Sequence, residues 1–249
     1  MASDQTGSVA GRFRAARRDP ALAVLEGLHA LKHAHRFGAP VLEVVRARSS
    51  PAAALAAALA PELLPVLEYA RVLDDDVFAQ LAPVPHATGV IAIAARPFTD
   101  TGPLLAATPA APVVLLERPS HLSNIGAAVR VAAAAGAAAL YTLGGEDPWH
   151  PAALRGGAGL QFALPCARLE TLPATPRRLV ALHPDGDPLD AATLDADSVF
   201  AFGTERGGLS AELLARADAR LRIPMRAGVS SLNLATAVAV VLYALVSRR

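Results

Sequence analysis

The chain reads VVLLERPSHLSNIGAAVRVAAAAGA from Val113 to Ala137, and this stretch indicates the fold most directly. Its first residues, VVLLE, form a nearly continuous apolar run, and the residues from Ser123 onward have the small, apolar composition of a packed helix. A strand without polar alternation is buried on both faces, which is typical of a parallel sheet covered by helices.

The same rhythm continues toward the C-terminus. Short apolar runs, most of them followed by turn residues, recur at Ala138–Leu143, Leu179–His183, Ser198–Phe202 and Leu221–Pro224. Such runs alternating with helices predict an α/β fold with a parallel sheet over residues 113–249. Ligands of these sheets bind at the carboxyl ends of the strands, so the turns after the strands are where functional residues are expected.

The first part of the chain predicts a smaller α/β domain over residues 19–97. Helical spacing runs from Ala21 to Phe37 and again from Asp76 to Leu81, while the runs Val41–Ala47 and Gly89–Ala95 suit strands. Residues 98–112, rich in Pro, Thr and Gly, predict a linker. Residues 1–18 predict a flexible basic arm, which either binds phosphates or is a solvated tail.

Composition narrows the classes of protein. The formal net charge of the 249 residues is +1, which by itself is no strong sign of nucleic-acid binding. Lys32 is the only lysine; an arginine bias suits phosphate binding and also follows from a GC-rich genome. A single cysteine, Cys166, excludes an internal disulfide and a multi-cysteine metal site, and no metal is expected. No secretory leader opens the sequence, so the cytoplasm is the expected compartment.

The run from Val229 to Val246 approaches the length of a transmembrane helix. Ser230, Ser231, Asn233 and Thr236 crowd its first two turns, which favours a buried core or interface helix. No membrane association is therefore expected.

The first turn of interest leads into the helix that follows VVLLE. Ser123 or Asn124 is expected to cap that helix, and Gly126 lets another backbone come close. Arg130 is the only charge within it. This arginine either reaches solvent or a structural carboxylate, or it meets an anionic ligand.

The second turn is FGTERGGLS, from Phe202 to Ser210, whose glycines allow a tight turn and expose backbone groups to a ligand. Glu205 is a candidate partner for Arg130. The loop has neither the GxGxxG of a dinucleotide fold nor the GK[ST] of a phosphate loop.

The third turn is IPMRAGVSSLN, from Ile223 to Asn233. If Ser230 or Ser231 caps the following helix, these polar groups lie at a helix N-terminus among free N–H groups. Capping explains one serine but leaves Asn233 without a role.

Together, in this order, the three turns resemble the signature motifs of the SpoU/TrmH family of RNA ribose 2′-O-methyltransferases, within the SPOUT superfamily. The motifs N-x-G-x-x-x-R, G-x-E-x-x-G-[LI]-[ST], and I-P-M followed by S-L-N are matched by Asn124, Gly126, Arg130, Gly203, Glu205, Gly208, Leu209, Ser210, Ile223, Pro224, Met225, Ser231, Leu232 and Asn233. A lesser pattern, R-x-S-x-G-x-x-F-x-x-P, is present as Arg155, Gly159, Phe162 and Pro165, with Gly157 in place of the serine.

The resemblance implies that the C-terminal part of the sheet is threaded into a trefoil knot, that S-adenosylmethionine binds in the knotted cleft, and that the protein is a homodimer. The residues implied to bind the cofactor are Leu182, Gly203, Thr204, Glu205, Ile223, Pro224, Met225, Ser231, Leu232 and Asn233. The residues implied to act in catalysis are Asn124, Arg130, Glu205, Ser231 and Asn233. The residues expected to bind RNA are Arg12, Arg14, Arg17, Arg18, Arg130 and Arg155.

In this interpretation residues 113–249 form the methyltransferase domain. Arg130 would act on the ribose or its phosphate, Ser231 and Asn233 would orient the reacting groups, and Glu205 would hold the loops by hydrogen bonds. Residues 19–97 resemble, more loosely, the small RNA substrate-binding domain that often precedes the catalytic domain.

Other functions fit less well. An inactive RNA-binding protein of the same fold is the alternative, and the presence of Asn124, Arg130, Glu205 and Asn233 argues against it. A Rossmann-type dinucleotide enzyme would need a GxGxxG turn, which is absent. Both rRNA and tRNA are open as targets, as are housekeeping modification and self-protection of an antibiotic producer.

Overall fold

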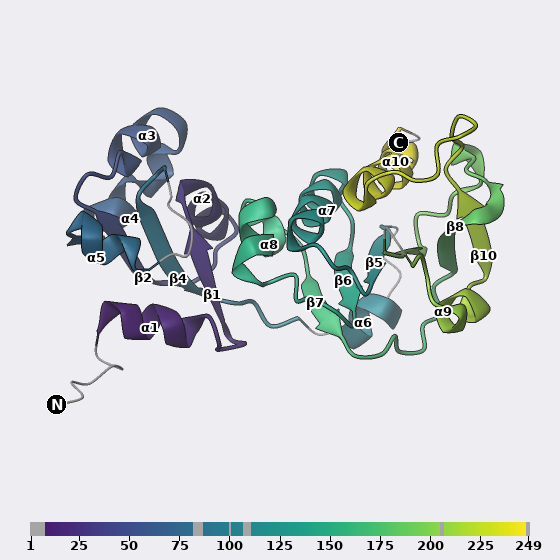
Figure 1. Ribbon diagram of the computed structural model, residues 1–249, viewed down its shortest axis with the longest axis horizontal. Helices are drawn as coiled ribbons and strands as arrows, with labels where there is room; N and C mark the ends of the chain where they lie inside the picture. The colour runs from purple at the N-terminus through teal and green to yellow at the C-terminus, as the bar shows by residue number, and fades with distance from the viewer. Residues whose placement is uncertain (1–7, 82–86, 100, 107–110, 205–206, 248–249) are drawn as a thin grey trace. The chain divides into compact units, whose positions relative to one another are not determined.

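The computed structural model describes residues 8–81, 87–99, 101–106, 111–204 and 207–247 (Figure 1). The chain divides into two compact units, and each is described by itself. Unit 1 holds residues 1–98 and 150–163, and unit 2 holds residues 99–149 and 164–249. The prediction of contiguous domains at 19–97 and 113–249 therefore missed one feature, because residues 150–163 belong to the first unit.

Unit 1 is built on a four-stranded sheet of order β1-β4-β2-β3. Its strands are β1 (Leu22–Glu26), β2 (Val41–Ala47), β3 (Arg71–Leu73) and β4 (Val90–Ala95). Strand β4 runs antiparallel to β1 and β2, whereas β3 runs parallel to β2. The helices are α1 (Val9–Ala16), α2 (Leu28–Arg36), α3 (Ala52–Leu59), α4 (Leu64–Glu68), α5 (Asp75–Ala79) and α8 (Pro151–Gly156), with 3-10 turns at Pro61–Leu63 and Leu160–Phe162.

Helix α1 corrects the prediction that residues 1–18 form a flexible arm. Ser8 caps the helix by accepting a hydrogen bond from the Gly11 amide at 3.0 Å. Val9, Phe13 and Ala16 lie on one side of the helix and are buried in the core of unit 1. These three apolar side chains pack the helix against the sheet of unit 1.

The segment predicted as one helix from Ala21 to Phe37 is a strand followed by a helix. Gly27, between β1 and α2, has a φ of 92°, which residues with a side chain rarely adopt, so helical geometry cannot continue through it. The predicted strands at Val41–Ala47 and Gly89–Ala95 are confirmed as β2 and β4, and a shorter α5 replaces the helix predicted from Asp76 to Leu81.

Unit 2 contains the predicted parallel sheet, which is confirmed. Its strand order is β10-β8-β9-β5-β6-β7 and every neighbouring pair is parallel. The strands are β5 (Val113–Glu117), β6 (Ala139–Leu143), β7 (Cys166–Leu169), β8 (Leu179–Pro188), β9 (Val199–Phe202) and β10 (Ala219–Arg222). The helices are α6 (Thr101–Ala106), α7 (Leu122–Ala135), α9 (Ala211–Arg216) and α10 (Leu234–Val246), with a 3-10 turn at Ala191–Thr193.

Helices α7 and α10 pack side by side on unit 2 (Figure 1). All residues of β5 are buried, as its apolar run predicts. Helix α7 ends at Gly136, which has a φ of 70° and adopts the left-handed conformation. Helix α10 buries Leu234, Val238 and Leu242 at helical spacing, as expected of a core helix. Within the described residues no helix combines the length and apolar character that a bilayer crossing requires.

Two boundaries differ from those predicted. Residues 98–112 include the helix α6 and are not wholly an extended linker. The last strand of the sheet is β10, from Ala219 to Arg222, so Ile223 and Pro224 follow the strand and do not end it.

Candidate functional site

A cavity of 650 Å³ lies where β8 and β10 meet the segment that leads into α10. Its lining residues are Leu182, His183, Pro184, Leu221, Arg222, Ile223, Met225, Arg226, Ala227, Gly228, Val229, Ser230, Ser231, Leu232 and Ala237. The size and the mixture of apolar side chains with a few polar groups are typical of sites for small molecules.

A break in the strand ladder creates this cavity. Arg220 pairs with Ala181, but the next residue of β10, Leu221, pairs with Asp187, so residues 182–186 of β8 bulge out of the sheet. Gly186 permits the close approach beside the bulge, because a Cβ there would lie 2.6 Å from the Arg220 carbonyl carbon. The bulge gives the cavity one wall, and the loop after β10 gives it another.

The predicted cofactor residues divide into two sets. Leu182, Ile223, Met225, Ser231 and Leu232 line the cavity. Four others, Gly203, Thr204, Pro224 and Asn233, are not among its described lining residues, and Glu205 lies outside the residues that the structure describes. His183, Gly228 and Ala237 line the cavity and were missed, since their positions depend on the bulge and on how α10 packs.

The glycine-rich turn after β9 closes on itself. Thr204 and Gly208 exchange backbone hydrogen bonds of 3.2 and 3.0 Å. A Cβ at Gly203 would lie 2.1 Å from the Gly208 carbonyl carbon, so no other residue fits at position 203 without moving the loop. Gly203 is therefore required for the shape of the turn, whatever the turn binds.

Glu117, at the carboxyl end of β5, anchors the end of this turn. Its carboxylate accepts hydrogen bonds from the Ser210 amide at 2.7 Å and the Ser210 hydroxyl at 2.5 Å, and the side chain is largely buried. The same hydroxyl caps α9 by accepting from the Leu213 amide at 3.1 Å. Glu117 was not among the residues predicted from the sequence, although a carboxylate that ends an otherwise apolar strand is a signal for such a role.

Asn233 joins the first and third motifs. Its Oδ1 accepts from the amides of Ala235 and Thr236 at 2.9 and 3.4 Å and so caps α10, while its Nδ2 donates to Asn124 Oδ1 on α7 at 3.0 Å. The expectation that Ser230 or Ser231 caps the helix is wrong, because Asn233 occupies that position and both serines are exposed.

The start of α7 also differs from the prediction. Its N-cap residue is His121, which makes no side-chain capping bond, so neither Ser123 nor Asn124 caps the helix. Asn124 lies inside the first turn instead, where its side chain reaches Asn233.

Arg130 lies on the exposed side of α7. Ile125, Ala128 and Val129 on the same helix are fully buried, so the arginine marks the boundary between core and solvent. Within the described residues no ion pair involves Arg130. Its guanidinium is accordingly accessible to an anion from solution.

Several arginines predicted to bind RNA are engaged within unit 1. Arg12 makes two hydrogen bonds to Glu43, at 2.9 and 2.6 Å. Arg17 and Arg155 both bind the Glu26 carboxylate, which is buried, and Arg17 also donates to a backbone carbonyl at 2.6 Å. These three side chains hold elements of unit 1 together, and their role as RNA contacts stays a prediction.

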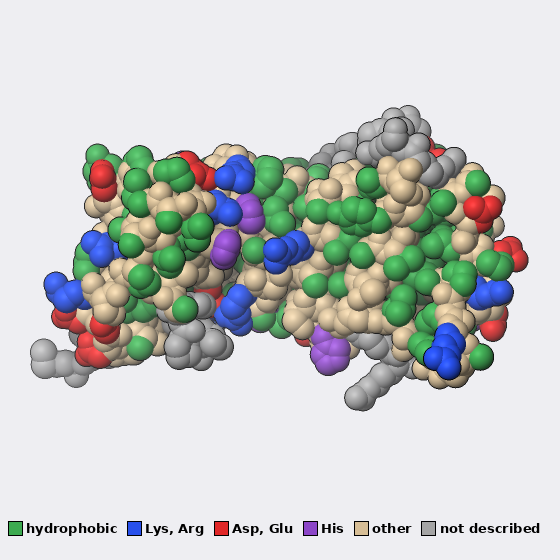
Figure 2. Space-filling model, turned by 90° about the horizontal axis from the view of Figure 1, so that it is seen from above, with side chains coloured by type: hydrophobic (Ala, Val, Ile, Leu, Met, Phe, Trp, Pro, Cys, Tyr) green, Lys and Arg blue, Asp and Glu red, His purple; other side chains and the backbone are tan. Residues whose placement is uncertain are grey.

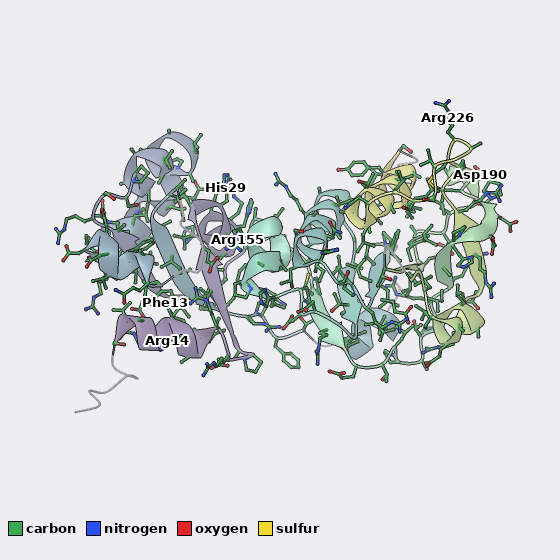
Figure 3. All side chains as sticks on the ribbon, viewed as in Figure 1. Phe13, Arg14, His29, Arg155, Asp190 and Arg226 are labelled. Atoms are coloured by element: carbon green, nitrogen blue, oxygen red, sulfur yellow. The ribbon has the colours of Figure 1, made fainter. Side chains whose placement is uncertain are left out.

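Arg14 and Arg18 are exposed and keep their role as predicted contacts; Figure 3 labels Arg14 beside Phe13 on α1. The cationic face of α2, where His29, Lys32 and Arg36 follow one another at helical spacing, was not predicted from the sequence. Figure 2 shows histidine, lysine and arginine side chains gathered on one face of unit 1. The spacing of three and four residues was the signal for this face.

Two contacts explain why residues 150–163 belong to unit 1. Arg155 on α8 binds Glu26 on β1, and a Cβ at Gly159 would lie 2.8 Å from the Ala30 Cα, so the absent side chain allows close packing on α2. Burial lowers the pKa of His33, whose Nδ1 lies 2.6 Å from the Ala158 carbonyl oxygen, and nearby cations on α2 lower it further. A neutral imidazole donating to that carbonyl fits this contact.

No group of three or more His, Cys, Asp or Glu side chains suited to a metal ion occurs in the described part of the chain. The cavity lies beside the start of α10, which Asn233 caps and where Asn233 contacts Asn124 of α7.

A parallel sheet with a ligand-sized cavity at the ends of two of its strands, lined by residues of the third turn, is the arrangement of a small-molecule site in an α/β protein. The family model described as the SpoU rRNA Methylase family matches residues 111–243, and the chain belongs to this family.

Relatives agree with this assignment. An uncharacterized tRNA/rRNA methyltransferase of Synechocystis is 31% identical over 74% of this chain and 70% of its own length. A 23S rRNA (uridine(2479)-2′-O)-methyltransferase of Streptomyces viridochromogenes is 31% identical over 55% of this chain and 52% of that protein. The crystal structure of the SpoU methyltransferase AviRb from Streptomyces viridochromogenes, in complex with the cofactor AdoMet, superposes with a TM-score of 0.75 at 25% identity, covering 98% of this chain and 94% of that one.

Proposed function

We propose that this protein transfers a methyl group from S-adenosylmethionine (AdoMet) to a ribose 2′-hydroxyl of rRNA or tRNA. The observation that carries the proposal is the junction of the first and third motifs through Asn124 and Asn233, next to the cavity that the third motif lines. The named activity of the Streptomyces viridochromogenes relative, methylation of a uridine 2′-oxygen in 23S rRNA, supports the choice of reaction.

The cavity residues fit AdoMet. The volume of 650 Å³ is in the range for a cofactor, Leu182, Ile223 and Leu232 offer apolar contact to an adenine or a thioether chain, and the loop after β10 brings backbone groups to the wall. When bound, the cofactor supplies an electrophilic methyl group, so no metal is required for the transfer.

The contribution of the chain is positioning. A ribose hydroxyl is a weak nucleophile, and holding two reactants in line can contribute roughly 7–11 kcal/mol. Arg130, exposed and without an ion pair in the described residues, binds the ribose or its phosphate in this proposal. Ser231, exposed at the cavity wall, and Asn233, at the start of α10, orient the reacting groups. The role of Glu205 in holding the loops stays a prediction, because Glu205 lies outside the described residues.

Further expectations belong to the same proposal. The C-terminal segment is threaded into a trefoil knot, the protein forms a homodimer, and it acts in the cytoplasm, where its RNA is found. The dimer is supported by the largely hydrophobic face of unit 2 on the side of α10 (Figure 2), where Tyr243 is 48% exposed. Unit 1 binds the RNA substrate, through the cationic face of α2 and the exposed Arg14 and Arg18.

Calorimetry with AdoMet and its demethylated product tests the cofactor, with NAD and ATP as controls that are not expected to bind. Arg130→Ala is then expected to leave AdoMet affinity unchanged and to slow methyl transfer by about 100-fold, the scale on which loss of one positioned charge is felt. Arg14→Ala, which removes another exposed arginine, is the matched control and keeps turnover at saturating RNA.

Absence of AdoMet binding, with and without RNA, would overturn the proposal and favour an inactive RNA-binding protein of this fold. Transfer at the wild-type rate by Arg130→Ala would show instead that the catalytic role is assigned to the wrong residue.

A further inference from the structure

Unit 1 has a cavity of its own, of 530 Å³, which none of the three motifs explains. Its lining residues are His35, Ala39, Val41, Leu42, Glu43, Val44, Val66, Tyr69 and Arg71. All of them belong to unit 1, so the cavity is formed within that unit alone.

An incomplete strand ladder leaves this cavity open. Strand β3 pairs only with the last residues of β2, from Val45 to Ala47. The first half of β2 therefore has no β3 partner, and its edge faces the space between the ends of α2 and α4. The unpaired backbone N–H and C=O groups at the edge of a strand can form hydrogen bonds with a ligand.

Tyr69 stands at this cavity with its side chain almost entirely in solvent. The residue is 91% exposed and follows the last turn of α4. Its ring is therefore accessible to a ligand that enters the cavity. Leu42, on the bulged position of β2, adds a second exposed apolar side chain to the same lining.

The charges around the cavity favour an anionic ligand. Arg12 binds Glu43 through two hydrogen bonds, which lower the pKa of this glutamate and balance its charge, and Arg71 lowers that pKa further. The exposed Arg71 guanidinium and the His35 imidazole are then the groups left to meet a ligand from solution.

An aromatic face beside a cation is how proteins bind unpaired nucleotides, with the base stacked on the ring and the phosphate held by the arginine. We propose that this cavity binds a single unpaired nucleotide of the RNA substrate, with Tyr69 stacked on the base and Arg71 at the phosphate. The inference rests on the proposed function, and it names the substrate as RNA with an unpaired segment that unit 1 recognises.

The full-length protein tests this by fluorescence anisotropy with labelled oligouridine, which cannot pair with itself, and with a labelled RNA duplex. Tyr69→Ala is expected to weaken oligouridine binding by about tenfold, since stacking of one base contributes roughly 1–3 kcal/mol. Tyr69→Phe, which keeps the ring, is expected to bind as the wild type does. Duplex affinity is expected to be the same in all three proteins.

Phe98→Ala is the matched control, because Phe98 is also in unit 1, is 93% exposed, and does not line the cavity. It is expected to bind oligouridine normally. Arg71→Ala is expected to weaken binding and to reduce the steepness of its salt dependence by about one phosphate contact.

Oligouridine binding by Tyr69→Ala at wild-type strength would overturn the inference, as would an equal loss in Phe98→Ala or an equal loss of duplex binding. Displacement of oligouridine by an acidic peptide at comparable concentration would also overturn it in favour of a protein ligand. Calorimetry with AdoMet separates this result from the proposed function. If the protein binds AdoMet and Tyr69→Ala binds oligouridine as tightly as the wild type, only the nucleotide site is refuted. If the protein does not bind AdoMet, the proposed reaction is refuted.

Discussion

Replacing Asn233 with alanine removes two functions of one side chain. Its Oδ1 caps α10, accepting from the amides of Ala235 and Thr236, and its Nδ2 donates to Asn124 on α7. Both functions hold the start of α10 in place beside the cavity.

The expected loss in the free energy of unfolding follows from these contacts. Loss of an N-cap side chain costs about 1 kcal/mol. The bond to Asn124 spans 3.0 Å but is exposed to solvent, so its net contribution is near the lower limit for a hydrogen bond, about 0.5 kcal/mol. We expect Asn233→Ala to lower the free energy of unfolding of unit 2 by about 1.5 kcal/mol.

The single tryptophan gives a selective assay. Trp149 belongs to unit 2, is 4% exposed, and donates from its indole nitrogen to the Cys166 carbonyl at 2.9 Å. Its fluorescence in a urea titration therefore reports the unfolding of the unit that contains α10. Asn233→Ser is the matched control: serine can cap the helix but is too short to reach Asn124, so most of the loss is expected to be recovered.

A double-mutant cycle with Asn124→Ala isolates the bond between the two asparagines, and a coupling of about 0.5 kcal/mol is expected. Two results would refute the reasoning. One is an Asn233→Ala protein as stable as the wild type. The other is an Asn233→Ser protein as unstable as Asn233→Ala, since the cap would then contribute nothing.

Two further predictions concern ion pairs in unit 1. Glu26→Gln leaves Arg17 and Arg155 without their buried counterion, so it is expected to destabilise unit 1 by about 3 kcal/mol, measured by circular dichroism in urea, and to expose residues 150–163 to proteolysis. Arg12→Ala is expected to cost about 1 kcal/mol near neutral pH, because the pair with Glu43 is partly exposed. The pKa of Glu43 is lowered in the folded protein, so this stabilisation is present above the ordinary glutamate value of about 4.3 and is lost as the pH falls through the lowered one. A difference between Arg12→Ala and wild type that persists in acid would contradict this assignment.

The sheet of unit 2 was predictable from sequence because its signal is local. A strand buried on both faces is largely apolar, and the first four residues of β5, VVLL, show this before Glu117 ends the strand. Helix α1 was missed for the opposite reason. The basic residues in and after it, Arg12, Arg14, Arg17 and Arg18, suggested a solvated arm, and only contact with the sheet shows that the spacing of Val9, Phe13 and Ala16 matters.

The membership of residues 150–163 in unit 1 was not predictable, because it depends on pairs of residues distant in sequence. Arg155 forms an ion pair with Glu26, and Gly159 packs closely against the backbone of Ala30. Both belong to the lesser R-x-S-x-G pattern, which sequence comparison assigned to the methyltransferase domain.

The sequence identified several residues of the candidate site but did not predict the shape of its cavity. The motifs named Ile223 and Leu232, and a strand end suggested Leu182; all three line the cavity. The bulge in β8 that shapes the cavity was not predicted, although Pro184 and Gly186 inside the strand are local signals for it. The helix cap was assigned to the serines and is made by Asn233, because the position of a cap depends on where the helix begins.

The most direct measurement of the central claim is a map of 2′-O-methylated nucleotides in rRNA and tRNA from cells with and without the gene. The account predicts at least one ribose that is methylated only when the gene is present, with the modification restored by the wild-type gene and not by Arg130→Ala. Identical maps in the two strains, or a gene-dependent methyl group on a base in place of a ribose, would contradict it.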